Sequence, residues 1–256
     1  MVLESVKSQS APPFEVLIAD DGSGEATADK VREVLAGSGL QWKHVRHDDN
    51  GIRQARVKNL AVRYAGGDYF IFIDHDVVLH PDFVKDHLAA AEENCFLQGK
   101  RAFMPAPYTR KLLEGSEAFT PPSFLMKGLE NRKNAIRLPG LGEIMGRKKK
   151  FQTSLRGCNV SMHKKDFMLI DGYDEFFDAT WGREDSDVCY RLFYNGIRIK
   201  NLWFSGLQYH LDHKVIKNRE KDILDLELEK IVREKRRKAR QGFSTMSAEG
   251  DVVASS

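Results

Sequence analysis

Apolar runs and helical spacings alternate along the first part of the chain. Residues 14–19, 41–47 and 69–73 have the length and apolar content of strands. The segments between them, 26–36 and 51–64, carry apolar residues at helical spacing and are followed by glycines. This order of strand, helix, strand, helix and strand predicts an α/β fold with right-handed connections. The run at 69–73 lacks polar alternation, which predicts a strand covered on both faces, as in a parallel sheet.

The pattern changes after residue 105. A helix is predicted from His80 to about residue 94 and a strand over 96–105. Residues 106–153 contain prolines, glycines and the basic run 147–150 without a sustained period. A loop of this length is usually functional or disordered, so we expect a mobile excursion there.

Regular patterning returns near residue 154 and leads to a charged C-terminal part. Residues 214–241 have apolar residues among many charges, which predicts an amphipathic helix with a basic end, and the small, polar residues after it predict disorder. The expected organisation is one domain over 1–213, with a first half at 1–105, the excursion at 106–153 and a second half at 154–213, then a helix at 214–241 and a tail at 242–256.

Composition limits the classes of function. The chain has 256 residues, of which 41% are hydrophobic and 30% charged, as in a soluble globular protein. A net charge of +3 gives no reason to expect a nucleic-acid partner. The odd number of cysteines, three, favours reduced thiols. Because no apolar run reaches the ~20 residues that span a bilayer and no signal peptide is visible, we expect a cytoplasmic protein.

Two aspartates follow the apolar run at 69–73. Ligands in open α/β sheets bind beyond the carboxyl ends of strands, where Asp74-His75-Asp76 lies. Two carboxylates set so close together favour a divalent cation that bridges to a phosphate. A solvated turn explains the same residues, and this stretch alone does not decide between the two.

A second acidic pair and a basic helix precede this site. Asp20 and Asp21 end the first predicted strand, where a carboxylate can accept hydrogen bonds from a ribose or a base, or else cap the next helix. Arg53 and Arg56 lie three apart in the helix of residues 51–64. Arginine suits phosphate oxygens, although a solvated helix face is the plainer explanation.

A third acidic group and two histidines follow the excursion. Glu184 and Asp185 come after an aromatic-rich segment, where a carboxylate can serve as a general base or cap a helix. His210 and His213 lie just after a predicted strand. They are candidate metal ligands only if they lie beside the aspartates of residues 74–76.

Five segments in this order resemble one enzyme family. They are FEVLIADDGS, DNGIRQARVKNLAVRYAGGDYFIFIDHD, RGCNVSMHKKDFMLIDGYDEFF, WGREDSDVCYRLFYNGIRI and YHLDH. Together they resemble the family 2 inverting glycosyltransferases of the GT-A fold, a Rossmann-like nucleotide-diphospho-sugar transferase fold with a mixed, mainly parallel sheet flanked by helices. The branch with a C-terminal part similar to β-1,4-galactosyltransferases is the most similar. The resemblance covers residues 3–213.

The resemblance implies a donor site. Asp21, supported by Asp20, would contact the uracil or ribose of a nucleotide-sugar, and Arg56 and Arg53 would lie beside the nucleotide. The remaining donor contacts implied by the family come from its DxD motif, here Asp74, His75 and Asp76.

The resemblance also implies a metal and a base. Asp74 and Asp76 would hold Mn²⁺ or Mg²⁺ against the diphosphate, with His210, or alternatively His213, completing the metal shell. Asp185 would be the catalytic base. The residues implied at the sugar or acceptor are Glu184, Gly157, Asn159, Trp181 and Gly182.

The implied activity is the metal-dependent transfer of a sugar, with inversion, from a nucleotide-sugar, most simply a UDP-sugar, to a hydroxyl of a glycan or glycolipid. Synthesis of bacterial cell-surface polysaccharide is the corresponding process. The basic end of the helix at 214–241 would touch the inner face of a membrane, or simply be solvated. A nucleotidyltransferase is disfavoured because the N-terminal part has no glycine-rich phosphate loop.

One family feature has no counterpart in this sequence. The family's usual first strand precedes a helix, and residues 1–9 resemble only the end of that helix. Without that strand, its neighbours would have unpaired backbone groups. We therefore expect either that the sequence is a piece lacking this strand or that another segment takes its place. A truncated, non-catalytic nucleotide-sugar-binding protein is the alternative function.

Overall fold

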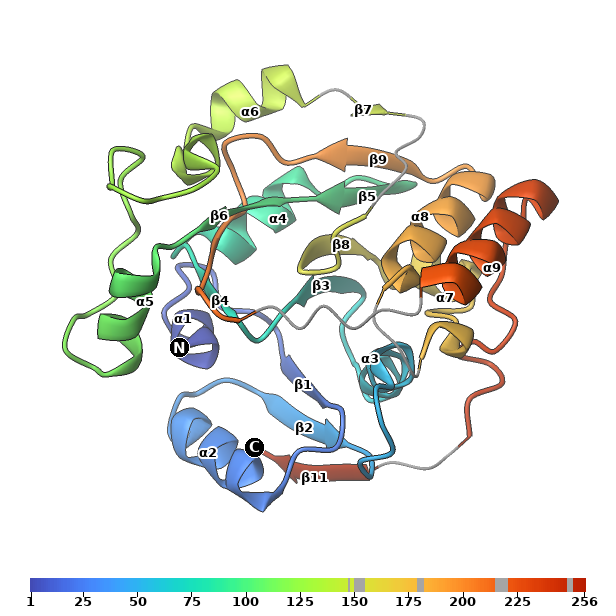
Figure 1. Cartoon of the computed structure of the whole chain (residues 1–256), viewed down its shortest axis with the longest axis horizontal. Coiled ribbons are helices and arrows are strands. Elements are labelled where there is room, and N and C mark those ends of the chain that lie inside the picture. Colours follow the sequence, from blue (N-terminus) through green and yellow to red (C-terminus); the bar gives the residue numbers. More distant parts are fainter. Residues whose placement is uncertain (147, 150–154, 179–181, 215–220, 248–250) are drawn as a thin grey trace.

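The computed structural model describes residues 1–146, 148–149, 155–178, 182–214, 221–247 and 251–256 (Figure 1). The strands are β1 (Val16–Asp20), β2 (Trp42–Arg46), β3 (Tyr69–Ile73), β4 (Val77–Leu79), β5 (Cys95–Gln98), β6 (Lys100–Phe103), β7 (Lys148–Lys149), β8 (Asn159–His163), β9 (Arg198–Asn201), β10 (Leu207–His210) and β11 (Asp251–Ser255). The helices are α1 (Val2–Lys7), α2 (Glu25–Leu35), α3 (Gln54–Arg63), α4 (Phe83–Ala90), α5 (Ala106–Leu113), α6 (Pro139–Met145), α7 (Lys164–Leu169), α8 (Glu184–Tyr194) and α9 (Lys221–Glu234), with 3-10 turns η1 (Arg132–Ala135) and η2 (Glu175–Phe177).

The described strands form three sheets with helices packed around them. Their orders are β1-β2-β11, β4-β10-β6 and β3-β8-β5-β9-β7. Figure 1 shows the first of these beside α2 at the bottom of the view and the five-stranded sheet above it, with α8 and α9 at its right. The predicted mixed α/β architecture is confirmed. Three strand pairs are parallel and five antiparallel, so the expectation of a mainly parallel sheet is wrong. Antiparallel β8 is the main cause, because it returns from the excursion and enters between β3 and β5.

Strand β3 lies at the end of its sheet. Its aromatic residues Phe70 and Phe72 pack against the large core cluster, and Ile71 and Ile73 pack against the cluster around Phe83. Both faces are therefore covered, as predicted, but every β3 residue remains partly exposed and the paired neighbour is antiparallel. The prediction of a strand buried in a parallel sheet is wrong in these two respects.

The open edge of β3 has a counterpart in β1. Strand β1 also ends its sheet, because it pairs with β2 on one side, and its residues from Val16 to Ala19 are partly or fully exposed. Among the described residues no strand pairs with the second edge of either β1 or β3. This agrees with the expectation that the family's first strand has no counterpart in this sequence.

The predicted strand over 96–105 is divided into two by Gly99. Strand β5 precedes this glycine and pairs with β9, whereas β6 follows it and pairs with β10 in another sheet. A Cβ atom at Gly99 would lie 2.0 Å from the Asn159 side-chain oxygen, so only glycine allows this close approach. The division carries the chain from one sheet to the other.

The excursion and the C-terminal part are more ordered than predicted. Helices α5 and α6 lie within 106–153, so the expected mobile loop is partly helical. Helix α9 confirms an amphipathic helix, and its Leu224 and Ile231 pack against Phe177. The expected disorder of 242–256 is wrong for the described residues, because β11 pairs with the free edge of β2. Its small apolar residues can complete a sheet edge, which composition alone did not reveal.

A buried ion pair fixes α8 in the core. Asp187 and Arg191 lie one helical turn apart and both side chains are 0% exposed. The Arg191 Nη1 also donates to the carbonyl oxygens of Ile170 and Gly172, at 2.6 and 2.7 Å. The guanidinium therefore joins the helix that carries the third acidic cluster to the loop after α7.

Replacing Arg191 by Met should leave the Asp187 charge buried without its partner. We expect the free energy of unfolding to fall by about 3–5 kcal/mol in a urea titration followed by circular dichroism. Arg110→Met on the exposed side of α5 is the control and should change it by less than about 0.5 kcal/mol. A loss below about 1 kcal/mol for Arg191→Met would contradict the assignment of a core ion pair.

Candidate active site

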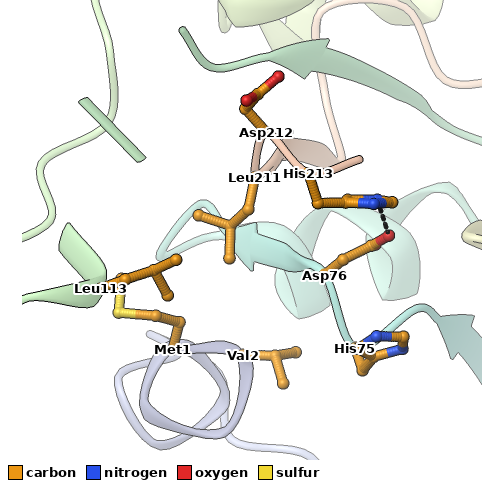
Figure 2. A pocket seen from close by; sticks show the side chains of 8 residues that line it. All are labelled: Met1, Val2, His75, Asp76, Leu113, Leu211, Asp212 and His213. Carbon is orange, nitrogen blue, oxygen red and sulfur yellow. Dashed lines mark hydrogen bonds and ion pairs between the residues drawn. The ribbon is translucent and has the colours of Figure 1, made fainter. Parts of the chain in front are cut away.

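A carboxylate and two imidazoles meet beyond the end of β3. The chain turns after β3 and continues as β4, which pairs with β10, and this pairing brings His210 beside Asp76. The Asp76 Oδ2 lies 3.2 Å from the His210 Nε2 and 3.0 Å from the His213 Nε2. Figure 2 shows Asp76 and His213 facing each other across this site, whereas Asp212 points away.

These three side chains offer ligand atoms for a metal ion. Their candidate atoms lie within 4.8 Å of one another. The buried Asp76 Oδ1 and His210 Nδ1 have no hydrogen-bond partner in the described structure. Burial alone would raise the pKa of Asp76, but the hydrogen bond and charge of His210, with those of the nearby histidines, lower it to about 2. A carboxylate kept ionised beside two imidazoles fits a divalent transition-metal ion.

The same residues line a cavity of about 340 Å³. One side of it is apolar and is formed by Met1, Val2, Leu113 and Leu211 (Figure 2). The polar side is formed by His75, Asp76, Asp212 and His213. His75 is exposed and lines the cavity without being part of the group around Asp76.

Asp74 is separate from this metal-ligand group. The described cluster contains Asp76 with both histidines and does not contain Asp74. Burial raises the pKa of Asp74, the charge of Lys58 opposes this rise, and the charges of Asp76 and Asp185 add to it. The two aspartates of the DxD motif therefore have different partners, and the structure brings both His210 and the alternative His213 to Asp76.

The first turn of α8 holds the second acidic group. The Gly157 N–H donates to the Asp185 Oδ2 at 2.7 Å, while the Asp185 Oδ1 is buried without a hydrogen-bond partner in the described structure. A Cβ atom at Gly157 would lie 2.4 Å from that Oδ1, so the glycine permits the approach. Burial and the charge of Asp185 raise the pKa of the neighbouring Glu184.

Asp20 and Asp21 are each paired with a histidine of the second strand region. The Asp20 Oδ2 lies 2.7 Å from the buried His44 Nε2, and its Oδ1 accepts from the Ser23 N–H. The Asp21 Oδ1 lies 2.7 Å from the His47 Nε2, and its Oδ2 accepts the Arg53 N–H at 2.8 Å. Both aspartates thus shape the loop between β2 and α3, and a ligand contact by Asp21 would use the remaining lone pairs or displace one partner.

Arg56 is buried beneath the start of α3. Its guanidinium contacts the Glu175 Oε2 at 3.3 Å and donates to the Ser247 Oγ at 2.8 Å. The backbone N–H groups of Ala55 and Arg56 donate to Asp178, so a carboxylate distant in sequence caps this helix. Burial raises the pKa of Asp178 to about 7 against these two hydrogen bonds. These contacts give Arg56 a structural role that its spacing from Arg53 did not indicate.

Asn159 differs from its predicted place in a sugar pocket. Its side chain is completely buried, and its amide donates to the carbonyl oxygens of Lys100 and Gly206. Its Oδ1 lies 3.0 Å from the His87 Nε2. Because these contacts hold the side chain inside the protein, it joins β8 to its neighbours. Trp181 lies outside the described residues, and Gly182 adopts a φ of 109° just before α8.

Lys58 is a member of the site that the sequence pattern did not reveal. Its ammonium nitrogen lies 4.0 Å from the Asp185 Oδ1 and 4.7 Å from the centre of the Tyr173 ring. In the sequence it is one basic residue of a helix with several, and its inward direction depends on the packing of α3. Asp178 was missed for a related reason, because its partners are backbone N–H groups.

This arrangement defines a class of protein. Mixed sheets with acidic clusters beyond their strand ends are the architecture of GT-A glycosyltransferases, and solved structures of that class share the fold. The chain resembles residues 1–349 of Staphylococcus aureus TarS in complex with UDP-GlcNAc, with a TM-score of 0.64, 16% identity, and coverage of 91% of this chain and 61% of that one. It also resembles the mannosyltransferase PcManGT of Pyrobaculum calidifontis in complex with GDP-Man and Mn²⁺, with a TM-score of 0.56, 15% identity, and coverage of 83% and 52%.

The sequence comparisons identify the family. Residues 2–152 match Glycosyl transferase family 2, and residues 146–214 match the N-terminal domain of galactosyltransferase. The chain belongs to glycosyl transferase family 2, as its motifs predicted.

Curated relatives agree with this assignment. The chain is 29% identical over 214 residues to chondroitin synthase of Escherichia coli, covering 77% of this chain and 30% of that protein. It is 30% identical over 209 residues to validoxylamine A glucosyltransferase of Streptomyces hygroscopicus subsp. limoneus, covering 76% and 45%. The chain therefore spans less than half the length of these relatives.

Replacing His213 by Ala should weaken metal binding without disturbing the fold, because its side chain is 45% exposed. We expect the affinity for Mn²⁺, measured by electron paramagnetic resonance without nucleotide, to fall roughly tenfold or more. Asp212→Asn is the control, since Asp212 lines the same cavity but points away from Asp76 (Figure 2). Equal affinities of the His213 variant and the wild type would remove His213 from the metal site.

Proposed function

We propose that this protein transfers one sugar from a nucleotide-sugar to an acceptor hydroxyl by direct displacement with inversion, in a metal-dependent reaction. The membership of glycosyl transferase family 2 supports the reaction class. The separation of a metal-ligand group around Asp76 from a base candidate at Asp185 supports the mechanism.

The carrying observation is the carboxylate of Asp185. Its Oδ2 is held by the Gly157 N–H, and its buried Oδ1 has no hydrogen-bond partner among the described residues. An oxygen held in this way is suited to accept a proton from a hydroxyl. As the acceptor oxygen bonds to the anomeric carbon, its proton passes to Oδ1, and the bond from that carbon to the diphosphate breaks with its electron pair leaving on the phosphate.

One carboxylate suffices for this reaction. A retaining double displacement needs a nucleophile that bonds to the sugar and a separate acid or base. Glu184 lies next to Asp185 in the first turn of α8, and burial and the charge of Asp185 raise its pKa, which suits hydrogen bonding to a sugar hydroxyl. A single displacement by the acceptor hydroxyl inverts the anomeric carbon.

Asp76, His210 and His213 would hold the metal ion, and Asp74 would face the ribose or the metal from the other side. When bound, a divalent ion stabilises the charge that develops on the leaving diphosphate. The two imidazoles favour Mn²⁺ over Mg²⁺, which prefers oxygen ligands. The residues around this site then keep the diphosphate between the end of β3 and the turn after β10.

The donor is proposed to be a UDP-sugar. The TarS comparison structure contains UDP-GlcNAc, whereas the mannosyltransferase structure contains GDP-Man, so the fold accommodates either nucleotide. Asp21 lies in the loop region after β1, where its carboxylate already accepts the Arg53 N–H. A uracil N–H bonded to the remaining lone pairs of Asp21 would favour UDP.

The acceptor is proposed to be a glycan or a glycolipid. The excursion exposes the apolar side chains Leu113, Phe124, Leu125 and Ile144, which could contact a sugar face or a lipid. The basic segment after α9 is the proposed contact with the inner face of a membrane, and a cytoplasmic location follows from this. No helix in the described part of the chain is long and apolar enough to cross a bilayer.

Asp185→Asn tests the base directly. The amide keeps the shape and can still accept the Gly157 N–H, but it cannot take the acceptor's proton. We expect kcat for release of UDP from a UDP-sugar with acceptor and Mn²⁺ to fall at least about 100-fold, while the Kd for UDP changes little. Near-normal turnover by this variant would reject Asp185 as the base, and absence of turnover in the wild type with all common UDP-sugars would favour a non-catalytic binding protein.

Gly157→Ala tests the approach that the glycine allows. The added methyl group would lie 2.4 Å from the Asp185 Oδ1 unless the carboxylate moved. We expect kcat to fall roughly tenfold or more with an unchanged Kd for UDP, because the base is displaced from its productive geometry. Gly140→Ala, where an added Cβ has open space, is the matched control. Equal kcat values for the two variants would contradict the role of Gly157.

A further inference from the structure

Lys58 lies where the acidic groups of the site converge. It projects from the second turn of α3, and its side chain is 19% exposed. Its ammonium nitrogen is 4.0 Å from the Asp185 Oδ1, the oxygen without a hydrogen-bond partner, and lies over the Tyr173 ring. The aromatic face attracts the ammonium by a cation–π interaction and limits its movement.

Electrostatic effects link Lys58 to three carboxylates. Burial lowers the pKa of Lys58, but Tyr173 and the charges of Asp185, Glu184 and Asp74 raise it above its ordinary value, so it stays protonated. In turn, the charge of Lys58 lowers the pKa values of Asp74 and Glu184, which burial raises. Lys58 is thus a shared counter-ion for groups on β3 and α8.

The distance between Lys58 and Asp185 matters. At 4.0 Å the ammonium is beyond the usual 2.7–3.2 Å range of a hydrogen bond, but its charge still acts strongly on the carboxylate. The Oδ1 lone pairs therefore stay available to an incoming hydroxyl. The other titratable groups near Asp185 are carboxylic acids, thiols and a phenol, none of which supplies a positive charge: Asp74, Glu184, Cys158, Cys189 and Tyr173.

We propose that Lys58 is a positioning residue that holds Asp185 ionised and oriented for proton transfer, without occupying the oxygen that takes the proton. This inference rests on the proposed function, in which Asp185 is the base. Its chemistry is that of the same single step, in which the acceptor's proton moves to the Asp185 Oδ1. Lys58 itself gains and loses no proton.

Lys58→Met tests this role because it keeps the length of the side chain and removes the charge. The acidic limb of the pH profile of kcat should move to higher pH by about one unit or more, so that kcat at pH 6 falls at least about tenfold while the profile converges with the wild type at alkaline pH. Lys58→Arg should restore most of the profile. Lys43→Met is the matched control, since Lys43 is another half-buried lysine paired with a carboxylate, Glu15, on the other side of the fold.

A second measurement does not depend on turnover. The ¹⁵N chemical shift of the Gly157 amide, which donates to Asp185, reports the ionisation of that carboxylate in the unliganded protein. Its titration midpoint should move to higher pH by about one unit or more in Lys58→Met and should remain unchanged in Lys43→Met.

The two measurements separate the failures of the two proposals. An unchanged Gly157 midpoint in Lys58→Met would overturn the role of Lys58, as would an equal loss of kcat at every pH together with a lower Tm, which marks a structural role. A wild type without turnover would reject the proposed function, and the Gly157 titration would still decide whether Lys58 controls Asp185.

Discussion

Neutralisation of carboxylates at one edge of the sheet is the constraint on which this structure depends. Asp74, Asp76, Glu184 and Asp185 approach one another in partly buried surroundings, where like charges and desolvation both oppose ionisation. The protein meets this constraint in two ways. Imidazoles act on Asp76 from the turn after β10, and a lysine acts on Asp185 from α3. The two solutions divide the site into a metal-binding part and a proton-accepting part.

The open edges of β1 and β3 affect the same site. The carboxyl ends of these strands carry Asp20 and Asp74, so the site lies beside a discontinuity between two sheets. Core packing on both faces holds β3 in place, through Phe70 and Phe72 on one side and Ile71 and Ile73 on the other. Side chains thus supply the order that backbone pairing supplies elsewhere, and the acidic groups still converge.

Sequence patterns predicted the parts that depend on local order. The strand at 69–73, the helix after residue 51 and the acidic residues at strand ends all follow from periodicity and turn chemistry. The direction of a side chain from a helix or strand does not, since it depends on packing among distant elements. For that reason Lys58 was not recognised, and Asn159 was expected in a pocket although it is buried among β8, His87 and two backbone carbonyls. Pairing of β11 with β2 likewise depends on an edge that becomes free only in the folded protein.

The central claim is that a single carboxylate, Asp185, promotes displacement at the anomeric carbon. The most direct test is the anomeric configuration of the first product, followed by ¹H nuclear magnetic resonance during transfer from a UDP-sugar of known configuration with Mn²⁺ present. Direct displacement predicts a product whose anomeric configuration is opposite to that of the donor. A product with the donor's configuration would contradict the account, because it would require a second displacement or a different stereochemical course.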